Sequence, residues 1–100
     1  MNPNETIRRA FAPYCKSYSE SVLTASAPVT SLNGTAIRAI NNDGTHPAVF
    51  TLTFCDTAET TMDIEVPASG NVELRPVKLF KQVAKSGSST DYIVYIGEPA

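Results

Sequence analysis

Apolar and polar residues alternate along much of the chain after residue 20, which predicts β-strands rather than helices. The clearest example is 48–55, where Phe50, Leu52 and Phe54 fall on one side and the residues between them on the other. Segments 61–66 and 72–74 repeat this pattern. We therefore expect one face of these three strands to form a common core, comprising Phe50, Leu52, Phe54, Met62, Ile64, Val66, Val72 and Leu74.

Further strands are predicted on both sides of this region. A weak first strand is expected at 20–25, a second at 35–41 and a last, more apolar one at 91–97. Segment 77–84 is ambiguous between a strand and a helical turn, of which Pro76 could be the first residue. Turn signals separate these elements, at Asn33-Gly34, 42–47, 67–70 and 85–89. About seven short strands divided by turns predict an all-β fold, either an immunoglobulin-like or a jelly-roll-type β-sandwich, over residues 20–100.

Residues 1–19 differ from this body and are predicted to form an N-terminal arm, either a short helix or an extended segment. Asn4 is a good helix N-cap, and apolar residues then recur at helical spacing until Pro13. At most two helical turns are possible, too few to be stable alone, so the apolar stripe must pack on something. It packs either on its own β body or on a neighbouring subunit. In the second case the partner-binding residues are Ile7, Arg8, Arg9, Phe11 and Tyr14.

Length and composition narrow the functional classes. One hundred residues make one domain. The net charge is −2 and the eight basic residues are scattered, which argues against a nucleic-acid surface. No apolar run is long enough to span a membrane, and we expect neither a membrane partner nor a secretory leader. Cys15 and Cys55 lie far apart without metal-ligand spacing and are expected to be unbridged thiols.

The residues that could carry chemistry do not form a recognisable set. His46 is the only histidine and lies in a turn-rich segment, where an exposed imidazole is expected. A nucleophilic pair of Cys55 and His46 would need the fold to bring them together and lacks a third group. Four carboxylates, Asp56, Glu59, Asp63 and Glu65, are close in sequence, but we expect them to be solvated. The sequence predicts no catalytic, cofactor-binding or metal-binding residues, and hence no enzyme.

Residues 36–99 resemble small structural proteins of tailed-bacteriophage virions, which include capsid decoration (cement) proteins and some neck or tail components. The segments that carry the resemblance are IRAINN at 37–42, FTLT at 50–53, MDIEVPASG at 62–70, VEL at 72–74 and YIVY at 92–95. Ser69, inserted before Gly70, departs from the pattern. The resemblance implies a scaffold fold and no particular site residues.

This resemblance predicts a non-enzymatic virion protein, assembled in the host cytoplasm. A capsid decoration protein that binds between capsomers is expected ahead of a neck or tail component. Its partners would be viral structural proteins, either the major capsid protein or neighbouring copies, in a homo-oligomeric or multi-copy assembly. The alternative, from a different class, is a cellular immunoglobulin-like binding module that recognises a protein or a glycan.

Overall fold

The computed structural model describes residues 16–19, 23 and 28–98, and these residues form two antiparallel β-sheets without any helix. The all-β prediction is therefore confirmed for this part of the chain. The strands are β1 (Lys16–Ser19), β2 (Ala36–Asn41), β3 (Ala48–Phe54), β4 (Thr61–Val66), β5 (Asn71–Leu74), β6 (Phe80–Gly87) and β7 (Tyr92–Gly97).

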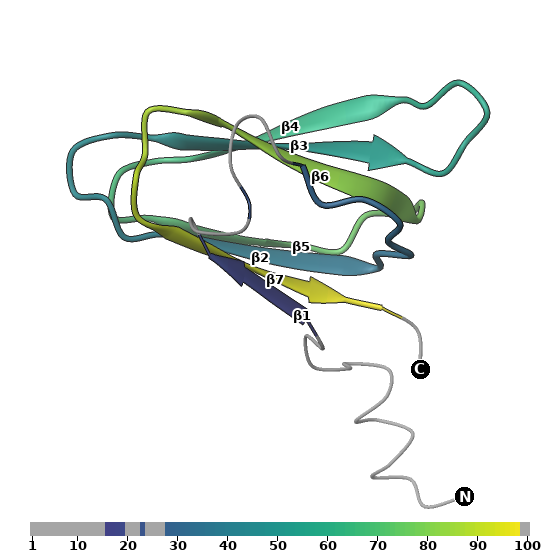
Figure 1. Cartoon of the computed structure of the whole chain (residues 1–100), viewed down its shortest axis with the longest axis horizontal. Helices are drawn as coiled ribbons and strands as arrows, with labels where there is room; N and C mark the ends of the chain where they lie inside the picture. The colour runs from purple at the N-terminus through teal and green to yellow at the C-terminus, as the bar shows by residue number, and fades with distance from the viewer. Residues whose placement is uncertain (1–15, 20–22, 24–27, 99–100) are drawn as a thin grey trace, which may run out of the picture.

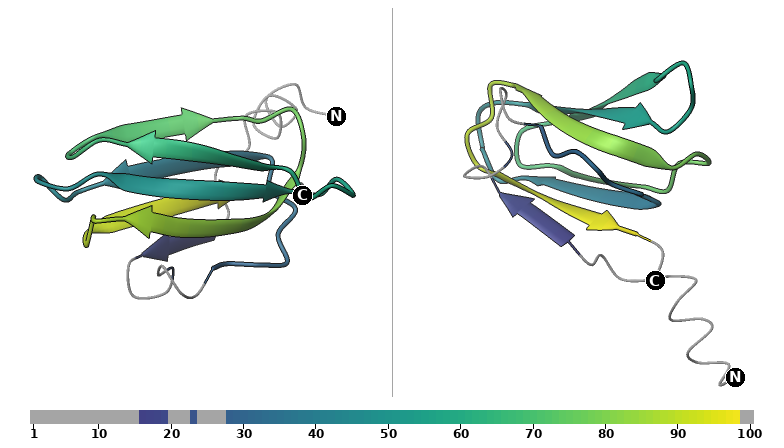
Figure 2. Two further views of the ribbon diagram at one scale, coloured as in Figure 1. Left: turned by 90° about the horizontal axis from the view of Figure 1, so that it is seen from above. Right: turned by 45° about the vertical axis from the view of Figure 1, so that its right-hand side comes forward.

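The two sheets lie face to face as two layers (Figures 1 and 2). One sheet has the strand order β1-β7-β2-β5 and the other the order β4-β3-β6. Residues 29–34 run antiparallel along the outer edge of β6, through bridges between Val29 and Val83 and between Gly34 and Phe80. Each bridge has backbone hydrogen bonds in both directions, of 2.8–3.1 Å. Ser31, with a φ of 60°, interrupts this pairing, which explains why the segment is not one continuous strand.

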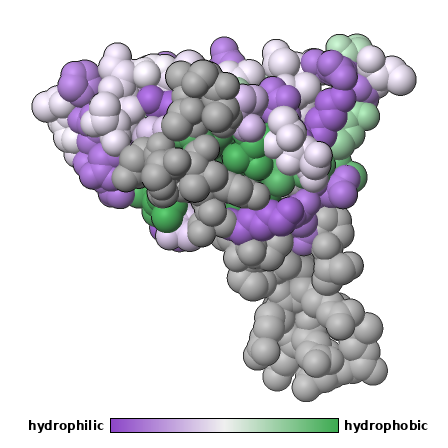
Figure 3. All heavy atoms as spheres, viewed as in Figure 1, coloured by the Kyte–Doolittle hydropathy of each residue, from purple (hydrophilic) through white to green (hydrophobic). Residues whose placement is uncertain are grey.

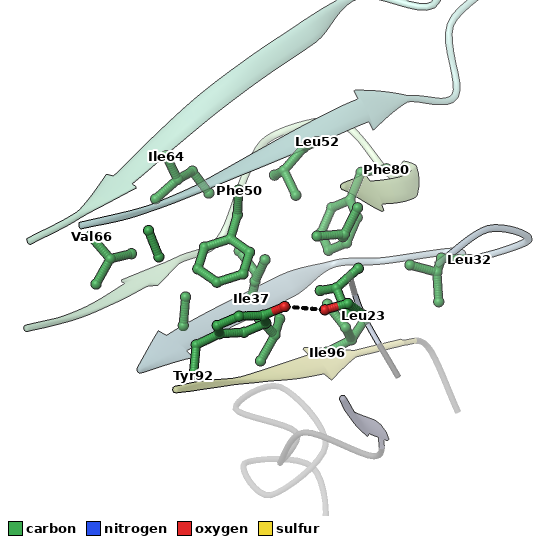
Figure 4. Close-up of a cluster of buried hydrophobic side chains, with 14 of the residues drawn as sticks. Leu23, Leu32, Ile37, Phe50, Leu52, Ile64, Val66, Phe80, Tyr92 and Ile96 are labelled. Carbon is green, nitrogen blue, oxygen red and sulfur yellow. Dashed lines mark hydrogen bonds between the residues drawn. The ribbon is translucent and has the colours of Figure 1, made fainter. Parts of the chain in front are cut away.

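The core lies between the layers, where side chains from both sheets meet (Figure 4). Phe50 and Phe80, from the β4-β3-β6 sheet, are fully buried and face Ile37 and Ile96 of the opposite sheet. Leu23, outside the strands, is also fully buried, and its carbonyl oxygen accepts a hydrogen bond from the Tyr92 hydroxyl. The predicted shared face is confirmed. Five of its eight residues belong to the buried cluster, and Met62, Val72 and Leu74 pack against it half-buried.

Strand positions follow the predictions closely where alternation is strong. Segment 61–66 matches β4, and the predictions at 35–41, 48–55 and 91–97 each differ from the structure by one residue at one end. The ambiguous segment 77–84 is a strand from residue 80 onward and continues to Gly87, through residues expected to form a loop. The predicted strand at 20–25 lies almost wholly outside the described residues, and Leu23 occupies a bend. Instead, β1 occupies 16–19, inside the segment assigned to the arm, where it pairs with β7.

Gly34 was expected in a turn, but its backbone pairs with Phe80. A Cβ atom at this position would lie 2.2 Å from the Phe80 ring, so the ring packs directly on the glycine backbone. The requirement for glycine here is close approach, which the dipeptide Asn33-Gly34 does not distinguish from turn formation.

Candidate docking surface

At one end of the molecule the β3–β4 hairpin rises away from β5 (Figure 1). An apolar cleft lies at this end, lined by residues of both sheets. The cleft has a volume of about 440 Å³. Phe54 and Met62 line it from one sheet, Leu74 lines it from the other, and Pro76 and Val77 of the β5–β6 connection complete it. Met62 and Leu74 are half-buried, Phe54 is buried, and all three belong to the inner faces of their strands, so the cleft is an opening into the edge of the core.

Two large apolar side chains are exposed on the β5–β6 connection, which borders this cleft. Val77 is fully exposed, at 104% of its reference surface, and Leu79 is 42% exposed. They are the only exposed large hydrophobic residues in the part of the chain that the structure describes. We call the cleft together with Val77 and Leu79 the cleft end. On the face drawn in Figure 3, by contrast, hydrophobic residues gather mainly in the seam between the layers and hydrophilic residues cover much of the rest.

Polar contacts hold the rim of the cleft end in place. Lys78 Nζ lies 3.3 Å from Asp56 Oδ2, and Lys81 Nζ lies 2.6 Å from Glu59 Oε1. The backbone N–H of Cys55 donates to the carbonyl of Leu79 at 2.9 Å. These contacts join the β3–β4 loop to the segment that precedes and begins β6. Exposed ion pairs stabilise little on their own, but here they fix the position of the loops that bear Val77 and Leu79.

On this rim, the Asp56 carboxylate is held in place by hydrogen bonds. Its carboxylate accepts hydrogen bonds from the Thr60 hydroxyl at 2.6 Å and the Thr60 backbone N–H at 2.9 Å. These bonds, assisted by Lys78, lower the pKa of Asp56 to about 2. The Glu59 carboxylate in turn raises the pKa of Lys81. Asp56 and Lys81 are therefore charged at neutral pH.

The lowered pKa predicts an acid-sensitive contribution of Asp56 to stability. A carboxyl group whose pKa is lower in the folded than in the unfolded chain stabilises the fold above its unfolded pKa of roughly 3.9. That contribution is lost as the pH falls toward about 2. We expect the unfolding free energy of Asp56→Asn, measured by urea denaturation, to fall less than that of the wild type between pH 4 and pH 2.

A matched control for this experiment is Glu65→Gln, which removes a carboxylate from an exposed position on β4. This variant should retain the acid-sensitive contribution of Asp56, because the contacts of Asp56 with Thr60 are unchanged. If Asp56→Asn and the wild type lost stability in parallel below pH 4, the hydrogen bonds of Thr60 to Asp56 would contribute nothing to the fold.

The opposite end of the molecule is a polar network that ties loops together. Asn41, only 1% exposed, donates from Nδ2 to the carbonyls of His46, Val66 and Pro67. Lys85 is also buried, with its Nζ bonded to the carbonyls of Gly87 and Ser89 and 4.9 Å from the centre of the Tyr92 ring. Because these buried polar groups form hydrogen bonds with carbonyl groups of the loops, anchoring of the loops accounts for their presence at this end.

Asp43 extends the polar network to the surface. Backbone N–H groups of Thr45 and Thr90 donate to its carboxylate, at 2.9 and 3.1 Å, and hold the pKa of Asp43 well below its usual range. The exposed His46 ring also contacts it, with Nδ1 3.1 Å from Oδ2. His46 is therefore one of the loop residues that contact the Asp43 carboxylate, and its ring is exposed as predicted.

The structure separates most of the residues that the sequence suggested for chemistry. His46 precedes β3 and Cys55 follows it, so the two residues lie nine positions apart at opposite ends of an extended strand, a separation of roughly 30 Å. This distance excludes a Cys55–His46 pair. Asp63 and Glu65 are exposed on β4, apart from the ion-paired Asp56 and Glu59. Among the described residues, no three His, Cys, Asp or Glu side chains are grouped so as to hold a metal ion.

The predicted partner-binding residues, Ile7, Arg8, Arg9, Phe11 and Tyr14, lie outside the described residues, as does Cys15. Cys55 is an exposed free thiol. The described part of the chain also contains no helix that is long and apolar enough to cross a membrane.

Sequence reasoning did not find the cleft end. The sequence feature that could have indicated it is the segment Pro76-Val77-Lys78-Leu79. There, apolar residues follow a proline just before β6 and do not belong to the alternating pattern of that strand. Comparison of the chain with protein-family models, with curated proteins and with solved structures finds no match in any of the three.

Proposed function

We propose that this chain is a non-enzymatic structural protein of a tailed-phage particle that docks on other proteins through its cleft end. A capsid decoration protein is the first form of this role, and a neck or tail component is the second. The observation that carries the docking role is the full exposure of Val77 beside an apolar cleft, at an end whose loops are held by ion pairs. Exposed apolar surface at a concave site is typical of protein interaction sites.

The strand pairing supports a jelly-roll β-sandwich as the fold behind this role. With residues 29–34 counted as a second strand, the first strand pairs with the last, β1 with β7, and the second with the penultimate, segment 29–34 with β6. The pairs β2–β5 and β3–β4 complete this nested series. Eight strands paired in this way are the arrangement of double-sheet jelly rolls, which are used in viral capsid and lectin domains.

The same pairing argues against the immunoglobulin-like alternative. In an immunoglobulin fold the last two strands belong to the same sheet. Here β6 pairs with β3, whereas β7 lies in the other sheet between β1 and β2. Because a fold alone does not determine a function, the virion assignment also depends on the sequence resemblance of residues 36–99.

A docking role in a repetitive particle fits the modest size of this surface. Copies held on a symmetric shell engage several neighbours at once, so a weak individual contact is multiplied by the effective concentration of the others. The arm residues Ile7, Arg8, Arg9, Phe11 and Tyr14 remain a predicted second contact with the particle.

The virion role is tested by purifying particles on a density gradient from the cells that make this chain. We expect the chain to sediment with the particles. A decoration protein should reach an abundance comparable to that of the main shell protein, and a neck or tail component only a small fraction of it. Quantitative mass spectrometry of the particle fraction measures this ratio. A chain that stays entirely in the soluble fractions while particles are abundant would contradict the virion role.

A further inference from the structure

We propose that the cleft end binds a second copy of this chain, in a two-fold symmetric dimer in which Val77 of each copy enters the cleft of the other. This inference rests on the proposed docking role of the cleft end and names the partner at that site. A two-fold interface uses the same patch on both copies, so the patch must be complementary to itself. The cleft end meets this requirement in both its shape and its charge.

The shape requirement is met because a protrusion and a cavity lie side by side. Val77 stands fully exposed at the mouth of the cleft, which is lined behind it by Phe54, Met62 and Leu74. In a single copy the Val77 side chain is surrounded by water and buries no apolar surface. A two-fold rotation near Val77 would place each valine against the apolar lining of the partner's cleft, where burial is favourable.

The charge requirement is met because the rim carries both signs. Arg75, Lys78 and Lys81 are basic, whereas Asp56 and Glu59 are acidic. The Glu59 side chain is 63% exposed despite its contact with Lys81, so it has room for a second basic partner. A copy turned by a two-fold axis can therefore set basic groups against acidic ones on both sides of the contact.

The predicted arm of the chain fits the cleft end less well. Residues 1–15 contain two arginines and one glutamate, which makes this segment net positive, and the rim also has more basic than acidic side chains. Residues 1–15 offer one carboxylate to the three basic side chains of the rim, whereas a second copy offers two, Asp56 and Glu59, so charge pairing favours the second copy. We therefore assign the second copy, and not the arm, to this site.

Sedimentation velocity of the purified full chain under reducing conditions tests the dimer directly. We expect a monomer that converts to a dimer as the protein concentration rises through the micromolar range, since the contact is small. Val77→Glu should raise the dissociation constant by about 100-fold or more, because each dimer would bury two carboxylates without designed partners. Its melting temperature at low protein concentration should equal that of the wild type, because Val77 is fully exposed.

Ala68→Glu is the matched control, because it adds the same charge at an exposed position in the turn before β5, away from the cleft lining. This variant should dimerise like the wild type. If Val77→Glu unfolds, Val77→Thr, which keeps nearly the same shape and adds one hydroxyl, should weaken the dimer by a smaller factor. Replacement of both Ile7 and Phe11 by Ser should leave the dimer unchanged.

Four results would overturn the proposal: a wild-type chain that stays monomeric to millimolar concentration, a dimer that survives Val77→Glu, species larger than a dimer, and loss of the dimer on substitution of Ile7 and Phe11. The last result would assign the cleft to the arm. The virion role is judged separately, by sedimentation with particles. A monomeric wild type that still joins particles would refute only the dimer, and a dimer that never joins them would refute only the virion role.

Discussion

Replacing Phe50 by alanine is expected to cost about 3–5 kcal/mol of unfolding free energy, a large share of the 5–15 kcal/mol typical of a folded domain. Phe50 lies at the centre of β3, which pairs with β4 on one side and β6 on the other, and its side chain is 0% exposed. Its ring also meets Tyr92 of the opposite sheet edge to face, with ring centres 5.7 Å apart. The truncation would therefore leave a cavity that strands on both sides prevent from collapsing.

The measurement is the denaturant midpoint of Phe50→Ala, compared with that of Val49→Ala. Val49 is the preceding residue on the same strand, faces the other side of the sheet and is only half-buried. Val49→Ala should lower the unfolding free energy by less than about 1.5 kcal/mol, since fewer atoms are removed from a less enclosed site. Equal midpoints for Phe50→Ala and the wild type would mean that the inner face of β3 has been assigned wrongly.

The sequence predicted this core because alternation depends only on the local chain. A strand with a buried and a solvated face must place apolar residues at every second position. Residues 48–55 and 61–66 follow this rule, and β3 and β4 lie where it puts them. The rule specifies which side chains share a face but says nothing about which strand lies opposite.

The errors occur where a residue's role depends on a distant partner. Lys85 in the sequence Lys-Ser-Gly indicated a loop, yet β6 continues through it because its backbone pairs with the distant strand β3, opposite Phe50. Gly34 indicated a turn, yet it lies against the ring of Phe80, 46 positions away. β1 has little alternation and forms through its ladder with β7. Such contacts depend on the tertiary fold and leave no local pattern.

The cleft end was unpredictable for a related reason. An exposed Val77 differs from a buried valine only in what surrounds it, and the surroundings are set by the divergence of the β3–β4 hairpin from β5. By contrast, the exclusion of a Cys55–His46 pair could have been reached from the sequence. The predicted strand between these residues already implied a separation of roughly 30 Å.

Replacing Asn41 is the second substitution that we expect to lower the stability strongly. Its buried side-chain amide donates hydrogen bonds to carbonyl groups that the tertiary fold brings together. Its Nδ2 donates to the carbonyl oxygens of His46 at 2.8 Å, Pro67 at 3.1 Å and Val66 at 3.3 Å. On its other side, Oδ1 accepts from the Ser89 hydroxyl at 2.7 Å. The amide thereby joins three loops at the polar end of the molecule, and its loss should loosen all of them together.

We expect Asn41→Asp to lower the unfolding free energy by about 3–5 kcal/mol near pH 7, the usual cost of an uncompensated buried charge. The variant has almost the same shape, but an oxygen replaces Nδ2 and would face three carbonyl oxygens. Burial and these oxygens should raise the pKa of the introduced carboxyl above its unfolded value of roughly 3.9. A neutral carboxyl could again donate one hydrogen bond, so the deficit relative to the wild type should shrink as the pH falls toward 4.

Asn42→Asp makes the same chemical change at the adjacent, exposed position. Its stability should stay within about 0.5 kcal/mol of the wild type, as is usual for surface substitutions. Urea denaturation of both variants and the wild type between pH 4 and pH 7 measures the difference. A deficit of similar size at the two positions, or one at residue 41 that does not change with pH, would contradict the role of Asn41 as the buried donor to these carbonyls. The expected outcome is a large deficit at residue 41 that depends on pH, because only there does the carboxylate replace an amide that is 1% exposed.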